Sequence, residues 1–240
     1  MATIDDLEIV VDPGLVRGTV EVANLEPLDM LRDSLQEVLN MGIDGVEPIA
    51  ENILENPAAR RDLVDYSMSY IPDANDMSAT LTGDTLEQIS DVDAVLSPTP
   101  INPAALEVSA TWAASSDDLQ EILNRFAEIA IRNVWLSSER TTYATYPDTQ
   151  RFRRYASANA CAFCQMMAIR GAVYYSRESA GEREQYHNNC RCLVIPENVG
   201  VPSYYNDWLE RYKRAREELP DEPSANDVVN SMRRDIRRSR

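Results

Sequence analysis

Histidine and lysine are almost missing from this chain of 240 residues, which holds one of each, His187 and Lys213. A Ser/His/Asp hydrolase would have to use that one histidine, and no G-x-S-x-G pattern accompanies it. No run of about 18 apolar residues is present, so the sequence predicts no membrane-spanning helix. The first residues contain neither a basic leader nor an apolar stretch, which favours synthesis and assembly in the cytoplasm.

Basic residues are also scarce in the first 150 positions. Residues 1–150 hold 28 Asp and Glu against 7 Arg, whereas residues 151–240 hold 12 against 16 Lys and Arg. Because an acidic surface repels nucleic acid, we expect any contact with packaged DNA to come from the arginine-rich C-terminus. That end of the chain contains Arg233, Arg234, Arg237, Arg238 and Arg240. A solvated helix end, where the helix dipole favours cations, explains these arginines equally well.

Turn and helix signals divide the first 70 residues into short elements. Alternating apolar residues over 7–22 predict a β-hairpin. A helical pattern begins at Pro27, and we expect Gly42 to end it. Two more short helices are expected over 46–55 and 58–70, because prolines bound both segments.

The middle of the chain combines a linker signal with the strongest helix signal. The helical pattern weakens after Pro72, and we interpret the segment SPTPINP at 97–103 as a linker. The residues SSDD at 115–118 then predict an N-cap, followed by an apolar stripe that extends to Val134. After Tyr146-Pro147, a second helix should lead into Cys161.

The last third of the chain predicts two strands and two helices. The segments AVYY at 172–175 and CLVI at 192–195 are typical of strands, and Pro196 should end the second. Residues 203–219 and 224–238 read as two helices separated by prolines.

All four cysteines and the only histidine lie within 32 residues, at Cys161, Cys164, His187, Cys190 and Cys192. A C-x2-C pair lets two thiolates reach one ion, and a second group of donors brought beside it completes a tetrahedral zinc site. Five candidates for four positions leave one residue over, and the spacing does not show which one. Four protein ligands leave no open position for a substrate, so we expect a structural Zn²⁺ and no catalytic one.

Three other uses of the cysteines fit less well. Disulfides suit small secreted domains, whereas we expect this chain to be made in the cytoplasm. A redox C-x-x-C usually lies beside a βαβ pattern, and none is visible here. A zinc deaminase needs H-x-E, whereas His187 is followed by Asn188 and Asn189.

Together these patterns predict an α+β fold that is mainly α-helical. It comprises an N-terminal hairpin and helices, a long central helix, a small zinc-knuckle β-hairpin and C-terminal helices. We expect an acidic module over 1–96, a Pro-rich linker over 97–103, a helical domain with the zinc knuckle over 104–200, and helices with an Arg-rich end over 201–240.

The cysteine region also resembles a known family. The segment ACAFCQMMAIRGAVYYS at 160–176, followed by YHNNCRC at 186–192 and by Pro196, resembles the C-terminal signature of MuF-like minor head proteins of tailed bacteriophages, especially those of actinobacterial phages. The likeness covers roughly residues 110–200, and its H-x-x-C-R-C element is fairly specific. Residues 1–100 show no likeness that we can name.

The resemblance implies a minor capsid protein of the virion, inside the head or at the portal vertex. Its implied partners are the portal protein and the major capsid protein, and its implied role is head assembly or genome packaging and ejection. Such proteins are often labelled capsid maturation proteases, but we find no catalytic residues here that support that activity. A capsid protease or other head-associated hydrolase remains the alternative, as does a host-directed zinc module that binds nucleic acid.

Overall fold

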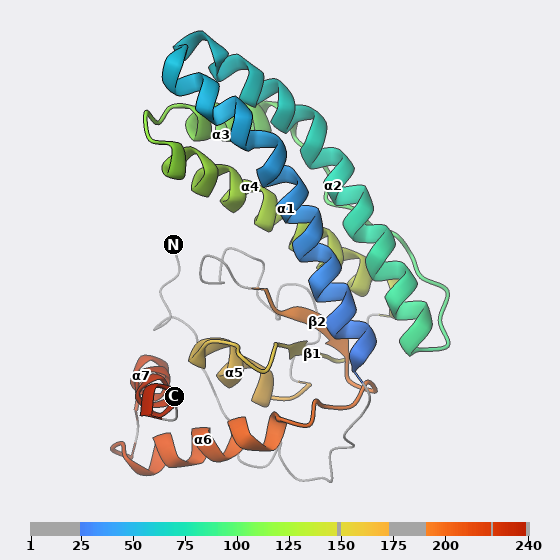
Figure 1. Ribbon diagram of the computed structural model, residues 1–240. Helices are drawn as coiled ribbons and strands as arrows, with labels where there is room; N and C mark the ends of the chain where they lie inside the picture. Colours follow the sequence, from blue (N-terminus) through green and yellow to red (C-terminus); the bar gives the residue numbers. More distant parts are fainter. Residues whose placement is uncertain (1–24, 148–149, 173–190, 222, 239–240) are drawn as a thin grey trace. The chain divides into compact units, whose positions relative to one another are not determined.

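The computed structural model describes residues 25–147, 150–172, 191–221 and 223–238 (Figure 1). It divides into two compact units, which we call the helical unit, Pro27–Thr145, and the C-terminal unit, within Tyr146–Arg240. The predicted linker over 97–103 lies inside the helical unit and does not separate two units. The hairpin predicted over 7–22 falls outside the described residues.

The helical unit is built from four α-helices and one short 3-10 helix. They are α1 (Glu26–Glu55), η2 (Pro57–Ala59), α2 (Arg60–Ile89), α3 (Pro103–Ala114) and α4 (Leu119–Thr145). Helix α2 packs against both α3 and α4. The apolar stripe predicted for α4 is confirmed, with Ile122, Phe126 and Val134 fully buried. The expected cap is present too, because the Asp118 carboxylate accepts a hydrogen bond of 2.8 Å from the backbone N–H of Glu121.

The predicted end of the first helix at Gly42 and the two separate short helices predicted over 46–55 and 58–70 are wrong. Helix α1 continues through Gly42 and Pro48, and α2 continues through Pro72. A proline inside a helix costs about 3 kcal/mol. Burial continues on both sides of each break, for example at Val46 and Ile53 in α1, so packing of the apolar face outweighs this local cost.

Gly42 has a packing role instead of a terminating one. The Tyr66 and Tyr70 rings of α2 stack with centroids 5.5 Å apart, and both lie close to Phe126 of α4. A Cβ atom built at Gly42 would meet the Tyr70 ring, with 2.9 Å to its Cζ atom, and would lie 3.2 Å from Cε1 of Phe126. The Tyr70 hydroxyl donates to the carbonyl of Val38, so α1 rests directly on this aromatic cluster.

The segment between α2 and α3 lies in an extended conformation along α4. Backbone N–H groups of Val95, Ser97 and Thr99 donate to the hydroxyls of Thr145, Thr141 and Ser137, at 3.1, 3.1 and 2.9 Å. Two extended residues advance about 6.6 Å and four helical residues about 6 Å, so the two spacings match. The Pro-rich segment is therefore bound to the helix by a regular set of hydrogen bonds.

In its described residues, the C-terminal unit combines a two-stranded sheet with three helices. Its elements are β1 (Phe152–Tyr155), α5 (Ala162–Ile169), β2 (Leu193–Pro196), α6 (Tyr205–Glu217) and α7 (Ala225–Arg238). The two strands pair antiparallel. The predictions of two C-terminal helices and of a strand that ends at Pro196 are confirmed. The fold class is likewise confirmed, since the described chain is mainly α-helical with one small sheet.

The helix expected between Pro147 and Cys161 is wrong, because the chain forms β1 there. Its aromatic residues Phe152 and Tyr155 are buried, and they pair with Pro196 and Leu193 of β2. The strand predicted over 172–175 falls almost entirely outside the described residues, and the partner that the structure gives β2 is β1. No helix in the described part of the chain is long and apolar enough to cross a membrane.

Replacing Gly42 tests the close approach of α1 to the aromatic cluster. We expect Gly42→Ala to lower the free energy of unfolding by about 1–3 kcal/mol, because the new Cβ overpacks against Tyr70. In a Tyr70→Leu background the same change should be neutral or stabilising by up to about 1 kcal/mol, because alanine favours helix once the ring is gone. Urea unfolding of the four proteins measures this coupling, and equal effects in both backgrounds would contradict the packing described.

Candidate metal centre and the adjoining polar network

Three of the five predicted zinc ligands lie in the described part of the C-terminal unit. Cys161 is exposed and occupies the N-cap position of α5 without a side-chain capping bond, and Cys164 is buried in the first turn of that helix. Cys192 is buried directly before β2. His187 and Cys190 lie outside the described residues. The partial positive charge of a helix N-terminus stabilises a nearby anion, and cysteine binds metal as the thiolate.

The strand register places the two cysteine segments at the same end of the sheet. Tyr155 pairs with Leu193, so β1 ends where β2 begins. Cys192 comes immediately before that pair, and the chain continues from Tyr155 to Cys161 within six residues. Antiparallel pairing therefore places Cys192 at the end of the sheet from which the chain continues to the C-x2-C element.

The described cysteines do not complete a metal site by themselves. Within the described ranges, no three His, Cys, Asp or Glu side chains are grouped as metal ligands would be. The five-residue zinc cluster therefore stays a prediction, and its second group of donors, His187 and Cys190, is the part that would complete it. The thiolate and imidazole donors suit Zn²⁺ in chemistry and number.

The C-x2-C element begins a helix, a feature that redox C-x-x-C motifs share. The flanking strands differ from a redox fold, however. β1 and β2 pair antiparallel, whereas the redox motif accompanies parallel βαβ strands. The local arrangement thus fits the start of a metal knuckle better than an oxidoreductase site.

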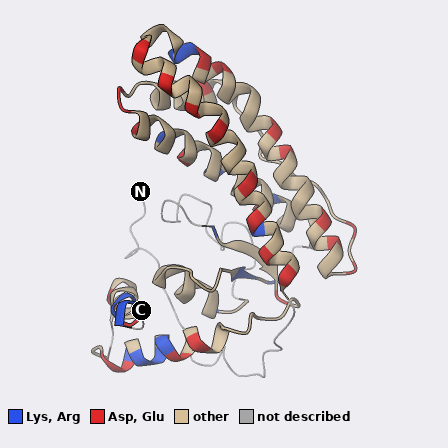
Figure 2. Cartoon of the chain, viewed as in Figure 1, with Lys and Arg blue, Asp and Glu red and all other residues tan. Residues whose placement is uncertain are grey.

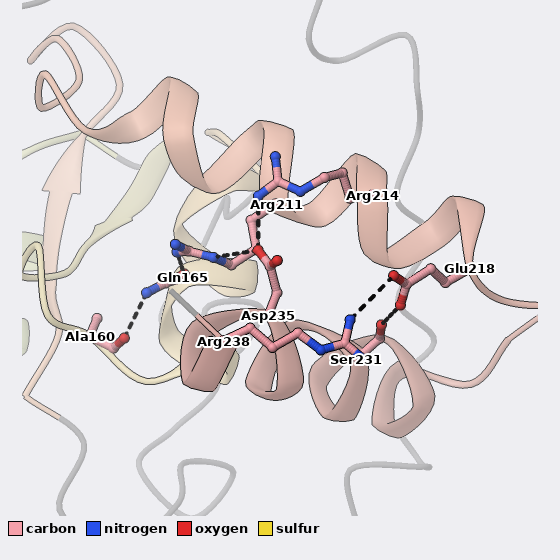
Figure 3. A network of polar contacts seen from close by, with 8 residues as sticks. All are labelled: Ala160, Gln165, Arg211, Arg214, Glu218, Ser231, Asp235 and Arg238. Carbon is pink, nitrogen blue, oxygen red and sulfur yellow. Dashed lines mark hydrogen bonds and ion pairs between the residues drawn. The ribbon is translucent and has the colours of Figure 1, made fainter. Parts of the chain in front are cut away.

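A polar network fixes the N-terminal turn of α5 against α6 and α7 (Figure 3). Gln165, which is 3% exposed, donates to the carbonyl of Ala160 at 2.8 Å and accepts from Nη1 of Arg211 at 2.8 Å. Arg211 Nε then donates to Oδ2 of Asp235 at 3.1 Å, and Arg214 donates to the same oxygen at 2.8 Å. The residue that precedes Cys161 is thereby connected to both C-terminal helices.

Asp235 is the centre of this network. Its hydrogen bond from Arg214, with a further contribution from Arg211, holds the pKa of the Asp235 carboxyl below its usual value. The same hydrogen bond raises the pKa of Arg214. The Asp235 carboxylate is therefore charged at neutral pH and is paired with two guanidinium groups, so the network binds the helices together.

A second buried group lies between the sheet and α6. The Arg153 guanidinium donates to the carbonyls of Glu197 and Gly200 at 2.5 and 3.4 Å, and burial lowers its pKa. Burial raises the pKa of Tyr205, whose hydroxyl donates to the carbonyl of Ile169 at 3.0 Å. The space that these residues enclose amounts to about 10 Å³, which is room for about one water molecule and not for a substrate.

The sequence contained a weak signal for the network that our prediction missed. Asp235 is the only acidic residue in the segment RRDIRR at 233–238. A single carboxylate in such a basic segment suggests that neighbouring arginines form ion pairs with it. Arg211 and Arg214 are one helical turn apart on α6, which puts both within reach of one partner. Gln165 carried no such signal, because its role depends on the packing of α5.

The comparisons with known proteins gave one finding. The family model described as "VG15 protein" matches residues 24–215 of the chain. The match covers the whole helical unit and extends through the cysteine region into α6. Neither a curated protein nor a solved structure matches the chain.

Neutralising Asp235 tests the network and its pH dependence. Because the folded pKa is lowered, the contribution of Asp235 to stability is complete above the unfolded pKa of about 3.8 and is lost as the pH falls through the folded value. We expect Asp235→Asn to lower the free energy of unfolding at pH 7 by about 1 kcal/mol and to reduce the loss of stability between about pH 5 and pH 2.

Urea unfolding at several pH values measures both effects. Asp221→Asn is the matched control, because Asp221 is exposed and its carboxylate takes part in none of these bonds. A variant at position 235 whose acid sensitivity equals that of the wild type would show that the two arginines do not stabilise this carboxylate.

Proposed function

We propose that this chain is a minor structural protein of a tailed-phage head. The chain belongs to the VG15 protein family and is a viral protein of the phage type. In this proposal it associates with the portal protein and acts in head assembly or in genome packaging and ejection. The observation that carries the proposal is the family match over residues 24–215, which includes both units. It also includes most of residues 1–100, where the sequence showed no resemblance.

The cysteine signature supports a location in the head. Its H-x-x-C-R-C element and C-x2-C pair resemble those of MuF-like minor head proteins. Such a protein would belong to the virion and would be present in few copies inside the head or at the portal vertex. The Asp235 network, which ties α5, α6 and α7 together, supports a structural role for the C-terminal helices.

Helix α3 offers a surface for the proposed partner. Its inner side packs on α2 and α4, while Val108 and Trp112 are 71% and 46% exposed one turn apart on its outer side. The Arg125 guanidinium lies 4.8 Å from the centre of the Trp112 ring and donates to the Trp112 carbonyl at 2.9 Å. A tryptophan held in this way is a ready anchor, because Trp and Arg dominate the binding energy of protein interfaces.

A structural Zn²⁺ completes the proposal. Cys161, Cys164, His187, Cys190 and Cys192 would supply the four ligands, with one of the five left over. Bound metal would hold the start of α5 to the start of β2. Because the ligands come together only in the folded chain, metal binding favours folding, and loss of the metal should lower the stability of the C-terminal unit.

Co-expression with the portal protein of the same phage tests the proposed function. We expect the wild-type chain to co-purify with the portal protein. In the double variant Trp112→Ala, Val108→Asp, the affinity for the portal protein should fall at least tenfold, because the anchor is removed. Met30→Asp is the matched control, because Met30 is 62% exposed in the first turns of α1, whereas the opposite end of that helix leads to Arg61, which pairs with Glu107 of α3. Failure of the wild-type chain to bind the portal protein or to appear in virions would overturn the proposal.

The same co-expression, with the major capsid protein added, addresses the protease alternative. Cleavage of the capsid protein that His187→Ala abolishes, in a variant that keeps its metal, would replace the structural role by a catalytic one.

Single alanine variants at the five candidate ligands test the zinc site. Elemental analysis of the purified wild-type chain should give one zinc per chain, and four of the five variants should lose it while the fifth retains it. The four should also unfold at a temperature several degrees lower, because metal binding contributes to folding. Ser157→Ala is the control for a change near the knuckle. Metal-free wild-type protein with paired disulfides would contradict the site.

A further inference from the structure

The solvent face of α7 carries a concentrated positive charge. Arg233, Arg234, Arg237 and Arg238 are all exposed, within the last two turns of the helix (Figure 2). The opposite face is apolar, with Val228, Val229 and Met232 buried. Helix α7 packs on α5 and α6 through that apolar face, so the arginines are left on its outer side.

The acidic groups of α6 and α7 do not neutralise this face. Asp235 is engaged by Arg211 and Arg214 of α6, and Asp227 accepts from the Ser224 hydroxyl at 2.8 Å. Glu218 lies 3.9 Å from Arg238, which is a weak pair at an exposed position. Within the described residues, no carboxylate pairs with Arg233, Arg234 or Arg237.

We propose that this arginine face of α7 binds the phosphate backbone of double-stranded DNA without sequence preference. Guanidinium groups match phosphate oxygens in geometry and keep their charge at any physiological pH. Asn230 lies one turn before Arg233 and Arg234, is exposed, and adds an amide that can donate to a phosphate. Because the exposed end of the helix consists mainly of arginines, we expect contacts with the phosphate backbone, and not the reading of base edges, to supply most of the affinity.

A lipid surface fits this helix less well. Helices that bind anionic membranes insert an apolar face between the headgroups. The apolar face of α7 is instead buried against the C-terminal unit, with Met232 at 0% exposure. The exposed face therefore offers charge without the apolar surface that membrane binding needs.

The proposed DNA-binding helix lies outside the region that the family model matches. The family match ends at residue 215, before α7 begins at Ala225. It also requires nothing of the metal site or of the α3 surface, so it stands or falls separately from the proposed function. The helical unit, with 21 Asp and Glu against 6 Arg over residues 27–145, would be repelled by the same DNA.

Fluorescence anisotropy with a labelled duplex of about 30 base pairs tests the proposal on the full chain. We expect binding that weakens steeply from about 50 to 300 mM salt and that is equal for duplexes of unrelated sequence. Arg234→Gln with Arg237→Gln should weaken binding and lower the slope of log K against log salt by about 2, because each phosphate contact contributes about 0.9. Arg234→Lys with Arg237→Lys should keep most of the slope, since the charge remains.

Arg60→Gln with Arg61→Gln is the matched control. It removes two positive charges from the helical unit, where Arg60 pairs with Asp117 and Arg61 with Asp65 and Glu107, and it should leave the slope unchanged. Thermal unfolding of each variant verifies the fold. Three results would overturn the proposal: a wild-type chain that does not bind DNA, a wild-type slope in the glutamine variant, or binding to vesicles of phosphatidylcholine and phosphatidylserine in place of DNA.

Discussion

The close packing of α2 against α4 is the constraint on which the helical unit depends. Small residues make this close packing possible. Ala74, Ser78 and Thr82 of α2 are each at most 1% exposed. The Ser78 hydroxyl donates across the interface to the carbonyl of Val134 at 2.5 Å. Thr82 and Thr142 instead donate to the carbonyls four residues before them in their own helices. These three buried hydroxyls thus have partners, so none of them adds the cost of an unsatisfied polar group.

This packing explains features that local sequence rules do not. With α2 and α4 held together, Tyr66, Tyr70 and Phe126 form one aromatic surface, and α1 can lie on it only because Gly42 has no side chain. The hydroxyls of α4 that do not face α2 receive the extended segment over 95–99. A Pro-rich stretch that would be a flexible linker by composition is therefore part of a packed unit.

The parts of the fold that could be predicted are those with a complete local signal. The stripe of α4 with its Asp118 cap and the strand ending at Pro196 depend on nearby residues, and both were predicted. The lengths of α1 and α2 were missed, because Gly42, Pro48 and Pro72 are breakers whose cost only tertiary burial offsets. β1 was missed for a related reason. A four-residue strand carries little periodicity, and its partner is about 40 residues away in sequence.

In the C-terminal unit, internal charge pairing and surface charge are two consequences of one arrangement. The basic segment of α7 contains a single carboxylate, and Arg211 and Arg214 of α6 hold it on the side that faces the neighbouring helix. If Asp235 faced solvent, it would offset the charge of Arg234 and Arg238 beside it. Because it is paired with Arg211 and Arg214 of α6, it stabilises the packing of the two helices and leaves Arg233, Arg234 and Arg237 exposed on α7. The network that fixes the start of α5, and with it Cys161 and Cys164, is thus also the reason that α7 presents arginines to its surroundings.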